Sequence, residues 1–227
     1  HTEEMLAEGA DIIDIGGEST RPGHVQITDQ EEIDRVAPII EAVKARFDVP
    51  VSLDTYKSAV AEAGIAVGAD LINDIWGLKY DPKMADVIAK ADVACCLMHN
   101  RDNSDYGDFL SEWYQETAEC VELAKKAGIA DDRIILDPGV GFGKTYEQNL
   151  TTIKYMDDLK KLGYPLLLGT SRKSVIGLTL DTPVTDRAVG TAVTTVFAVQ
   201  QGYAFVRVHD IKVNKQAIQM TKAILNA

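Results

Sequence analysis

The chain of 227 residues contains 46% hydrophobic and 26% charged residues, a composition typical of soluble globular proteins, and it is long enough for one large α/β domain. Its formal net charge of −12 argues against a nucleic acid or an anionic membrane surface as partner, because both require a surplus of lysine and arginine. An anionic small molecule can still bind where a pocket gathers its own basic residues.

The cysteines Cys95, Cys96 and Cys120 form an odd set without C-x-x-C spacing. Cys95 and Cys96 lie in an apolar run, where cysteine behaves as a small buried hydrophobe, so packing is favoured over a metal or redox role. A reducing cytoplasm is the expected location. We see no apolar stretch as long as a membrane span and no signal peptide.

Short apolar runs recur along the chain and are nearly continuous rather than alternating. This pattern predicts parallel strands that are covered on both faces. The predicted strands start at Asp11, Pro50, Asp70, Val93, Arg133, Pro165 and Phe205.

Helical patterns separate these strands. Residues 29 to 47 follow a Thr28-x-x-Glu31 capping box, and residues 146 to 162 follow a Thr145-x-x-Gln148 box. The expected apolar stripes are Ile33, Val36, Ile40 and Val43 in the first helix, and Leu150, Ile153, Met156 and Leu159 in the second. Glycines at positions where a left-handed residue would close a helix are Gly9, Gly68, Gly128, Gly163 and Gly202.

The order of elements predicts a (β/α)8 barrel. Each predicted strand is followed by a helix, and an additional helix stands at the front without its strand. We therefore expect a single barrel domain over residues 1–227 that lacks its first strand, preceded in the native protein by a further segment, because the chain opens on His1 and barrels of this class have about 250 residues. A doubly wound open sheet is the alternative, but its glycine fingerprint does not follow the first strand.

The segment "LDPGVGFGKT", residues 136–145, resembles a phosphate-binding P-loop but does not fit one. Only three residues separate Gly139 from Gly143, whereas the P-loop pattern requires four. The position one residue further back is Pro138, which has no backbone N–H to donate to a phosphate. A strand end that runs into a capped helix is the better interpretation.

Polar residues gather at the expected carboxyl ends of the strands, where barrels of this class carry their chemistry. Asp54 and Asp137 suit a ligand with N–H donors, whereas Arg21, Lys173, Arg207 and His209 suit phosphate or carboxylate oxygens. Structural alternatives remain open for single residues. Asp54 and Asp74 can be helix N-caps, Asp137 can belong to an ordinary turn, and a buried, paired His99 is favoured over a catalytic one.

The motifs "DIIDIGGESTRPG", "SLDTYK", "LINDIWG", "LMHNR", "LDPGVGFGKT", "LGTSRKS" and "RVHD" together resemble the dihydropteroate synthase family of pterin-binding barrels. The resemblance covers essentially the whole chain. It implies the condensation of 6-hydroxymethyl-7,8-dihydropterin pyrophosphate with p-aminobenzoate, which yields 7,8-dihydropteroate and pyrophosphate.

The resemblance also implies roles for individual residues. The pterin would be bound by Asp54, Asn73, Ile75, Met98, Asp137 and Lys173, and the pyrophosphate by Thr20, Arg21, Arg207 and His209. The residues expected around p-aminobenzoate are Thr20, Arg21, Pro22, Phe142, Lys173 and Ser174, and those expected to be catalytic are Asp54, Asp137, Lys173, Arg207 and His209. Mg²⁺ is the implied cofactor, with an asparagine from the missing first strand as its expected ligand, so the metal site is not assigned.

Three other functions remain as alternatives. A methyltetrahydrofolate–corrinoid methyltransferase would share Asp54, Asn73 and Asp137 but would not need the "STRPG", "SRKS" or "RVHD" segments. A class I aldolase would use Lys173 as a Schiff-base lysine. A binding protein would hold pterin without turnover.

The helix predicted over residues 186–201 is apolar on more of its circumference than an outer barrel helix requires. This feature favours a subunit interface, and the resemblance implies a homodimer. Tight packing of small residues against the barrel is the alternative.

Overall fold

The computed structural model describes residues 1–19 and 25–227. The strands are β1 (Ile13–Gly16), β2 (Val51–Asp54), β3 (Leu71–Asp74), β4 (Ala94–Met98), β5 (Ile134–Asp137), β6 (Leu167–Leu168) and β7 (Phe205–Val206). The α-helices are α1 (Thr2–Ala7), α2 (Asp29–Arg46), α3 (Ser58–Ala66), α4 (Met84–Ala91), α5 (Phe109–Ala127), α6 (Tyr146–Tyr155), α7 (Ser174–Leu180), α8 (Ala188–Gln200) and α9 (Ile211–Leu225). Short 3-10 helices are η1 (Asp131–Arg133), η2 (Met156–Leu162) and η3 (Val184–Asp186).

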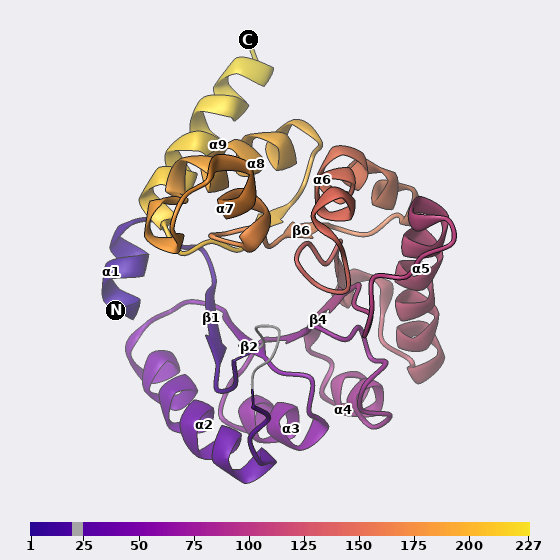
Figure 1. The fold of residues 1–227 in the computed structure, drawn as a ribbon. Helices are drawn as coiled ribbons and strands as arrows, with labels where there is room; N and C mark the ends of the chain where they lie inside the picture. The colour runs from indigo at the N-terminus through magenta and orange to yellow at the C-terminus, as the bar shows by residue number, and fades with distance from the viewer. Residues whose placement is uncertain (20–24) are drawn as a thin grey trace.

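The strands form a ring of parallel neighbours with the helices outside it, as in a (β/α)8 barrel (Figure 1). β1 to β5 pair in sequence order, a parallel bridge joins Leu136 to Leu166, and β6 pairs with β7. In the part of the chain that the structure describes, no ladder joins β7 to β1. The α/β barrel predicted from the order of elements is confirmed.

The strands are buried on both faces, which explains their continuous apolar sequence. Every residue of β2, β3 and β5 is buried, with Val51 and Leu53 at 0% exposure. Side chains of one face fill the inside of the barrel, and those of the other pack on the surrounding helices. The charged residues that end these strands are therefore carried into the interior of the protein.

Most predicted helix boundaries are confirmed. The five predicted helix-closing glycines all have positive φ, from 74° at Gly202 to 109° at Gly68. The capping box at Thr145 is complete, whereas Glu31 donates its backbone N–H to Thr28 and turns its side chain to Arg35, 2.5 Å away.

The second predicted helix differs from the expectation in two respects. Its last part, η2, winds as a 3-10 helix, so the residue spacing changes after Tyr155. The predicted stripe also fails at Leu150, which is 40% exposed, whereas Met156 and Leu159 are fully buried. Within α6 the buried residues are Asn149 and Thr152, one position before the predicted Leu150 and Ile153, and an apolar pattern does not detect these two polar residues.

Candidate active site

The predicted site residues come from the carboxyl ends of neighbouring strands. Asp54, Met98 and Asp137 are the last residues of β2, β4 and β5. The strand register places Asp54 opposite Asn73 of β3, and Met98 opposite Asp137. All four are buried, with exposed fractions between 4% and 7%. Parallel pairing thus brings residues that are far apart in the sequence to one end of the barrel.

Asp54 lies in an ion-pair network that joins Asp14 within β1, Asp54 at the end of β2 and Arg207 directly after β7. The Arg207 guanidinium donates to Asp54 Oδ2 at 2.7 Å and to Asp14 Oδ2 at 2.7 Å through Nε. Ser52 in turn donates to Asp14 Oδ1 at 2.6 Å. Burial and the neighbouring Asp14 carboxylate raise the pKa of Asp54, whereas Arg207 opposes this shift. Asp54 therefore does not act as a helix cap, and its Oδ1 is a buried acceptor without a hydrogen-bond partner among the described residues.

Asp137 and Lys173 face the same small space above β6. Asp137 Oδ1 accepts the backbone N–H of Gly139 at 2.7 Å, the contact of an ordinary turn. A Cβ atom at Gly169 would lie 3.3 Å from Asp137 Oδ2 and 3.9 Å from Lys173 Nζ, so the glycine leaves room between the two side chains. Burial raises the pKa of Asp137 and lowers that of Lys173 to about 8, and each charge partly offsets the shift of the other.

An apolar wall lies beside these charges. Ile75 and Met98 pack with Tyr56, and the half-buried ring of Phe142 packs against this cluster. The ammonium of Lys173 lies 4.7 Å from the centre of the Phe142 ring. The wall and the polar groups together suit a flat heterocycle that has hydrogen-bonding edges.

His209 and the start of α7 occupy the side near β7. The Ser171 hydroxyl lies 2.8 Å from His209 Nδ1 and accepts the backbone N–H of His209 at 3.0 Å. Arg172, which has a φ of 56°, donates through Nε to Asp210 at 2.9 Å. Ser174 begins α7 and is exposed. The predicted residues Thr20, Arg21 and Pro22 lie outside the described residues.

The N-cap interpretation of Asp74 is wrong, whereas the interpretation of His99 as a buried, paired histidine fits the structure. Asp74 accepts the backbone N–H groups of Trp76 at 2.9 Å and Leu78 at 2.7 Å, and thereby closes a turn rather than capping a helix. His99 is buried, with a partner at each ring nitrogen.

Sequence reasoning missed Lys57, a buried cation that contacts Glu18, Ile27 and Glu32. Lys57 forms ion pairs with Glu18 at 2.7 Å and Glu32 at 2.9 Å, and donates to the carbonyl of Ile27 at 2.7 Å. Glu18 also accepts the backbone N–H of Ile27. The available signal was a lysine three residues after the end of a strand in "SLDTYK". Asp14 was missed as well, although it is a charged residue inside an apolar strand, a placement that calls for a partner.

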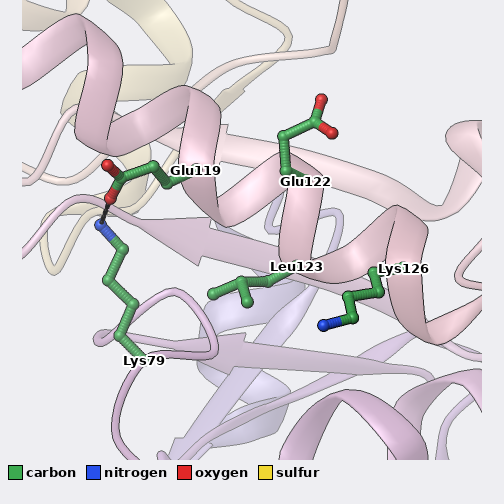
Figure 2. Close-up of a pocket in the computed structure, with 5 residues that line it drawn as sticks. All are labelled: Lys79, Glu119, Glu122, Leu123 and Lys126. Atoms are coloured by element: carbon green, nitrogen blue, oxygen red, sulfur yellow. Dashed lines mark hydrogen bonds and ion pairs between the residues drawn. The ribbon is translucent and has the colours of Figure 1, made fainter.

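A separate surface depression lies along α5 and contains none of the predicted site residues (Figure 2). Its residues are Lys79, Glu119, Glu122, Leu123 and Lys126, and Lys79 pairs with Glu119 at 2.9 Å. Its lining carries charges of both signs. None of the described helices has the length and apolar composition needed to cross a membrane.

Comparisons with known proteins identify the family of this chain. The family model described as pterin binding enzyme matches residues 1–209. The dihydropteroate synthase of Clostridium beijerinckii is 56% identical over 99% of this chain and 84% of its own length, and that of Bacillus subtilis is 48% identical over 100% and 79%.

Solved structures of dihydropteroate synthases share this fold. A dihydropteroate synthase from Clostridium difficile, determined in the presence of pteroic acid, superposes with a TM-score of 0.98 at 46% identity and covers 100% of this chain and 87% of its own. The Xanthomonas albilineans dihydropteroate synthase with 4-aminobenzoic acid gives a TM-score of 0.96 at 37% identity, over 100% of this chain and 84% of its own. The chain therefore belongs to the pterin-binding enzyme family, within which it is a member of the dihydropteroate synthases, transferases of folate biosynthesis.

Proposed function

We propose that the polar end of the barrel, within a single pterin-binding domain over residues 1–227, is where 6-hydroxymethyl-7,8-dihydropterin pyrophosphate and p-aminobenzoate condense to 7,8-dihydropteroate and pyrophosphate. The observation that carries this assignment is the pair of buried carboxylates, Asp54 and Asp137, on β2 and β5. Oδ1 of Asp54 is buried without a partner in the described residues, which suits it to accept an N–H group of the ligand.

The pterin ring would lie between these carboxylates and the apolar wall. Asp137 accepts hydrogen bonds from the amino group and the ring N–H, and Asp54 and Asn73 bind other edges. Lys173 donates to ring acceptors, while Ile75 and Met98 contact a face of the ring. In this assignment the carboxylates of Asp54 and Asp137 act only as acceptors and the ammonium of Lys173 acts only as a donor.

The reaction breaks the bond between the pterin methylene carbon and the pyrophosphate oxygen. The aromatic amine of p-aminobenzoate forms the new carbon–nitrogen bond and loses a proton, and the electron pair leaves with pyrophosphate. Buried carboxylates near the methylene stabilise the positive charge that develops on it. Arg207 and His209, with Thr20 and Arg21, would bind the departing pyrophosphate.

The p-aminobenzoate would lie toward α7. Phe142 packs on its ring, Ser174 binds its carboxylate, and Lys173, Thr20, Arg21 and Pro22 complete the pocket. The exposure of Ser174 supports this placement, because the second substrate enters from solvent.

Mg²⁺ fits this site as an ion that arrives with the pyrophosphate. Among residues 1–19 and 25–227, no group of three or more His, Cys, Asp or Glu side chains converges in a metal cage. A phosphate-bound Mg²⁺ keeps several waters and needs one or two protein carboxylates, and those nearest to Arg207 are Asp14 and Asp54. When bound, the ion would share the negative charge of the leaving group.

A homodimer in the cytoplasm is the proposed state of the protein. Val189, Val193 and Phe197 form an outward stripe on α8, with exposed fractions of 74%, 52% and 44%. An apolar stripe of this kind supports a subunit interface. The three cysteines are buried thiols, which supports a reducing compartment.

The function is tested by measuring pyrophosphate release with Mg²⁺, with and without p-aminobenzoate, alongside the formation of dihydropteroate. Asp137→Asn should lower kcat/KM by about 100-fold, because the amide replaces one acceptor oxygen with a donor. Asp157→Asn, on the exposed side of η2, is the matched control. A wild-type chain that binds pterin pyrophosphate but forms no dihydropteroate would contradict the proposal.

A further inference from the structure

Lys144, the lysine of the P-loop-like segment, has no assigned role in the reaction above. Its ammonium lies 2.8 Å from Nδ1 of His99, 2.9 Å from the carbonyl of Gly139 and 3.0 Å from the carbonyl of Phe142. An ammonium group carries three N–H donors and no acceptor, so these three contacts satisfy it completely. The lysine thus ties the turn of residues 139–143 to the residue that follows β4.

The same contacts define the tautomer of His99. Because the ammonium of Lys144 can only donate, Nδ1 of His99 accepts and carries no proton. The proton of the neutral ring then lies on Nε2, which donates to Glu116 at 3.0 Å. Glu116 is held in turn by Arg101 at 2.8 Å. A chain of hydrogen bonds therefore leads from the turn through His99 to α5.

The charges around this chain favour the neutral ring. Burial, and the positive charge of Lys144, lower the pKa of His99 to about 4, although Glu116 opposes the shift. Burial lowers the pKa of Lys144 to about 7, with Asp137 and Glu116 raising it and Lys173 lowering it further. His99 is thus uncharged at neutral pH, as its acceptor role requires.

The turn has no room to shift toward β4. Gly139 has a φ of 71°, and a Cβ there would lie 1.8 Å from the carbonyl oxygen of His99. Gly143 has a φ of 53°, and its Cβ would lie 2.6 Å from the carbonyl oxygen of Arg101. Asp137, whose carboxylate accepts the N–H of Gly139, is coupled directly to the position of this turn.

We propose that Lys144 is a positioning residue for the pterin site, which together with a neutral His99 and Glu116 fixes the turn of residues 139–143 so that Asp137 and Phe142 meet the pterin. The proposal rests on the proposed function of the site. The lysine does not touch the pterin, and it acts through two backbone carbonyls and one imidazole. The letters that imitate a P-loop are explained by this packing, in which Lys144 binds protein carbonyls instead of phosphate.

The first test reads the His99 ring directly. Long-range ¹H–¹⁵N correlation spectra of the full chain with ¹⁵N-labelled histidine should show His99 as the Nε2–H tautomer between pH 5 and 6, where Lys144 is charged and the His99 ring is neutral, without ligand. Lys144→Met removes the donor to Nδ1 and should introduce the Nδ1–H form or exchange between the two. Lys154→Met, on the exposed side of α6, should leave the spectrum unchanged. An Nδ1–H ring in the wild type would overturn the proposal.

The second test compares two substitutions of the same histidine. His99→Asn keeps an acceptor near the position of Nδ1, whereas His99→Gln keeps an amide near Nε2 and loses the acceptor that faces Lys144. Lys144→Met and His99→Gln should each weaken the binding of 6-hydroxymethylpterin by at least about tenfold, as loss of a hydrogen bond to a charged group does. His99→Asn should stay within about threefold of the wild type.

The outcomes separate the two proposals. Wild-type binding of pterin by Lys144→Met, with its melting temperature matched to Lys154→Met, would overturn the positioning role and leave the proposed function intact. Failure of the wild type to bind pterin would overturn the proposed function. The tautomer of His99 would still show whether the hydrogen bonds from Lys144 through His99 to Glu116 are formed. If Lys144→Met does not fold, the wild-type spectrum and the contrast between the two His99 variants decide the proposal.

Discussion

Replacement of Gly139 by alanine should damage the site far more than it damages the fold. The residue has a φ of 71°, and left-handed backbone costs a non-glycine residue about 1–2 kcal/mol. A Cβ would also lie 1.8 Å from the His99 carbonyl oxygen, whereas real Cβ contacts essentially never fall below 3.0 Å. The turn would have to move by about 1 Å, and a misplacement of that size can cost roughly 100-fold in rate.

Gly128→Ala serves as a control that separates the cost of a left-handed backbone from the effect of moving the turn. Gly128 closes α5 at a φ of 89°, and nothing lies within 4 Å of the position that a Cβ would occupy there. Urea unfolding should show a loss of about 1 kcal/mol for Gly128→Ala with unchanged kcat/KM. Gly139→Ala should lose somewhat more stability and about 100-fold in kcat/KM for the pterin substrate. Equal kinetic losses in the two variants, or none in Gly139→Ala, would refute the argument that the turn places Asp137.

Four further predictions follow from particular contacts. Asp14→Asn should lower kcat about tenfold with little change in pterin affinity, because Arg207 loses a charged acceptor at 2.7 Å, and an unchanged kcat would contradict this. Burial lowers the pKa of His99 from 6.5 to about 4, so between these pH values only the unfolded chain binds a proton at this residue. The free energy of unfolding should therefore fall by about 3 kcal/mol as the pH decreases from 6.5 to 4. His99→Asn should lack this loss in matched urea titrations. Asp74→Ala should destabilise the fold by about 2 kcal/mol, because two backbone N–H groups lose their acceptor, while pterin affinity measured by calorimetry stays unchanged. Val193→Glu should dissociate the proposed dimer in sedimentation experiments, and a wild type that is monomeric at every concentration would refute the interface.

The fold was predictable because each strand can be identified from its local sequence. Continuous apolar runs, capping boxes and terminal glycines are properties of short segments, and they identified every described strand. The order of the elements then left few topologies. The stripe of residues 146–162 was wrong at Leu150 because the buried positions of α6 are the polar Asn149 and Thr152, which an apolar pattern does not detect.

The carboxylates of the site were predictable for a similar reason. Asp54 and Asp137 end apolar strands, and parallel pairing must bring such ends together. Their partners were not predictable, because Arg207 joins Asp14 across 193 positions of the chain, and no local pattern records that contact. A charged residue within an apolar strand signals only that some partner exists.

The segment from Gly139 to Lys144 shows why residue types alone do not define a phosphate site. In a P-loop the glycines expose backbone N–H groups to the ligand, and the lysine extends to the same phosphates. Here the glycines instead allow the turn to press against carbonyl oxygens at positions 99 and 101, where a side chain would collide. Those close approaches leave carbonyls of the turn facing inward, and the ammonium of Lys144 is drawn to them and to His99 rather than to an anion. In this chain the glycines and the lysine therefore hold a turn whose Gly139 N–H binds Asp137, and the lysine contacts carbonyls and an imidazole in place of a phosphate.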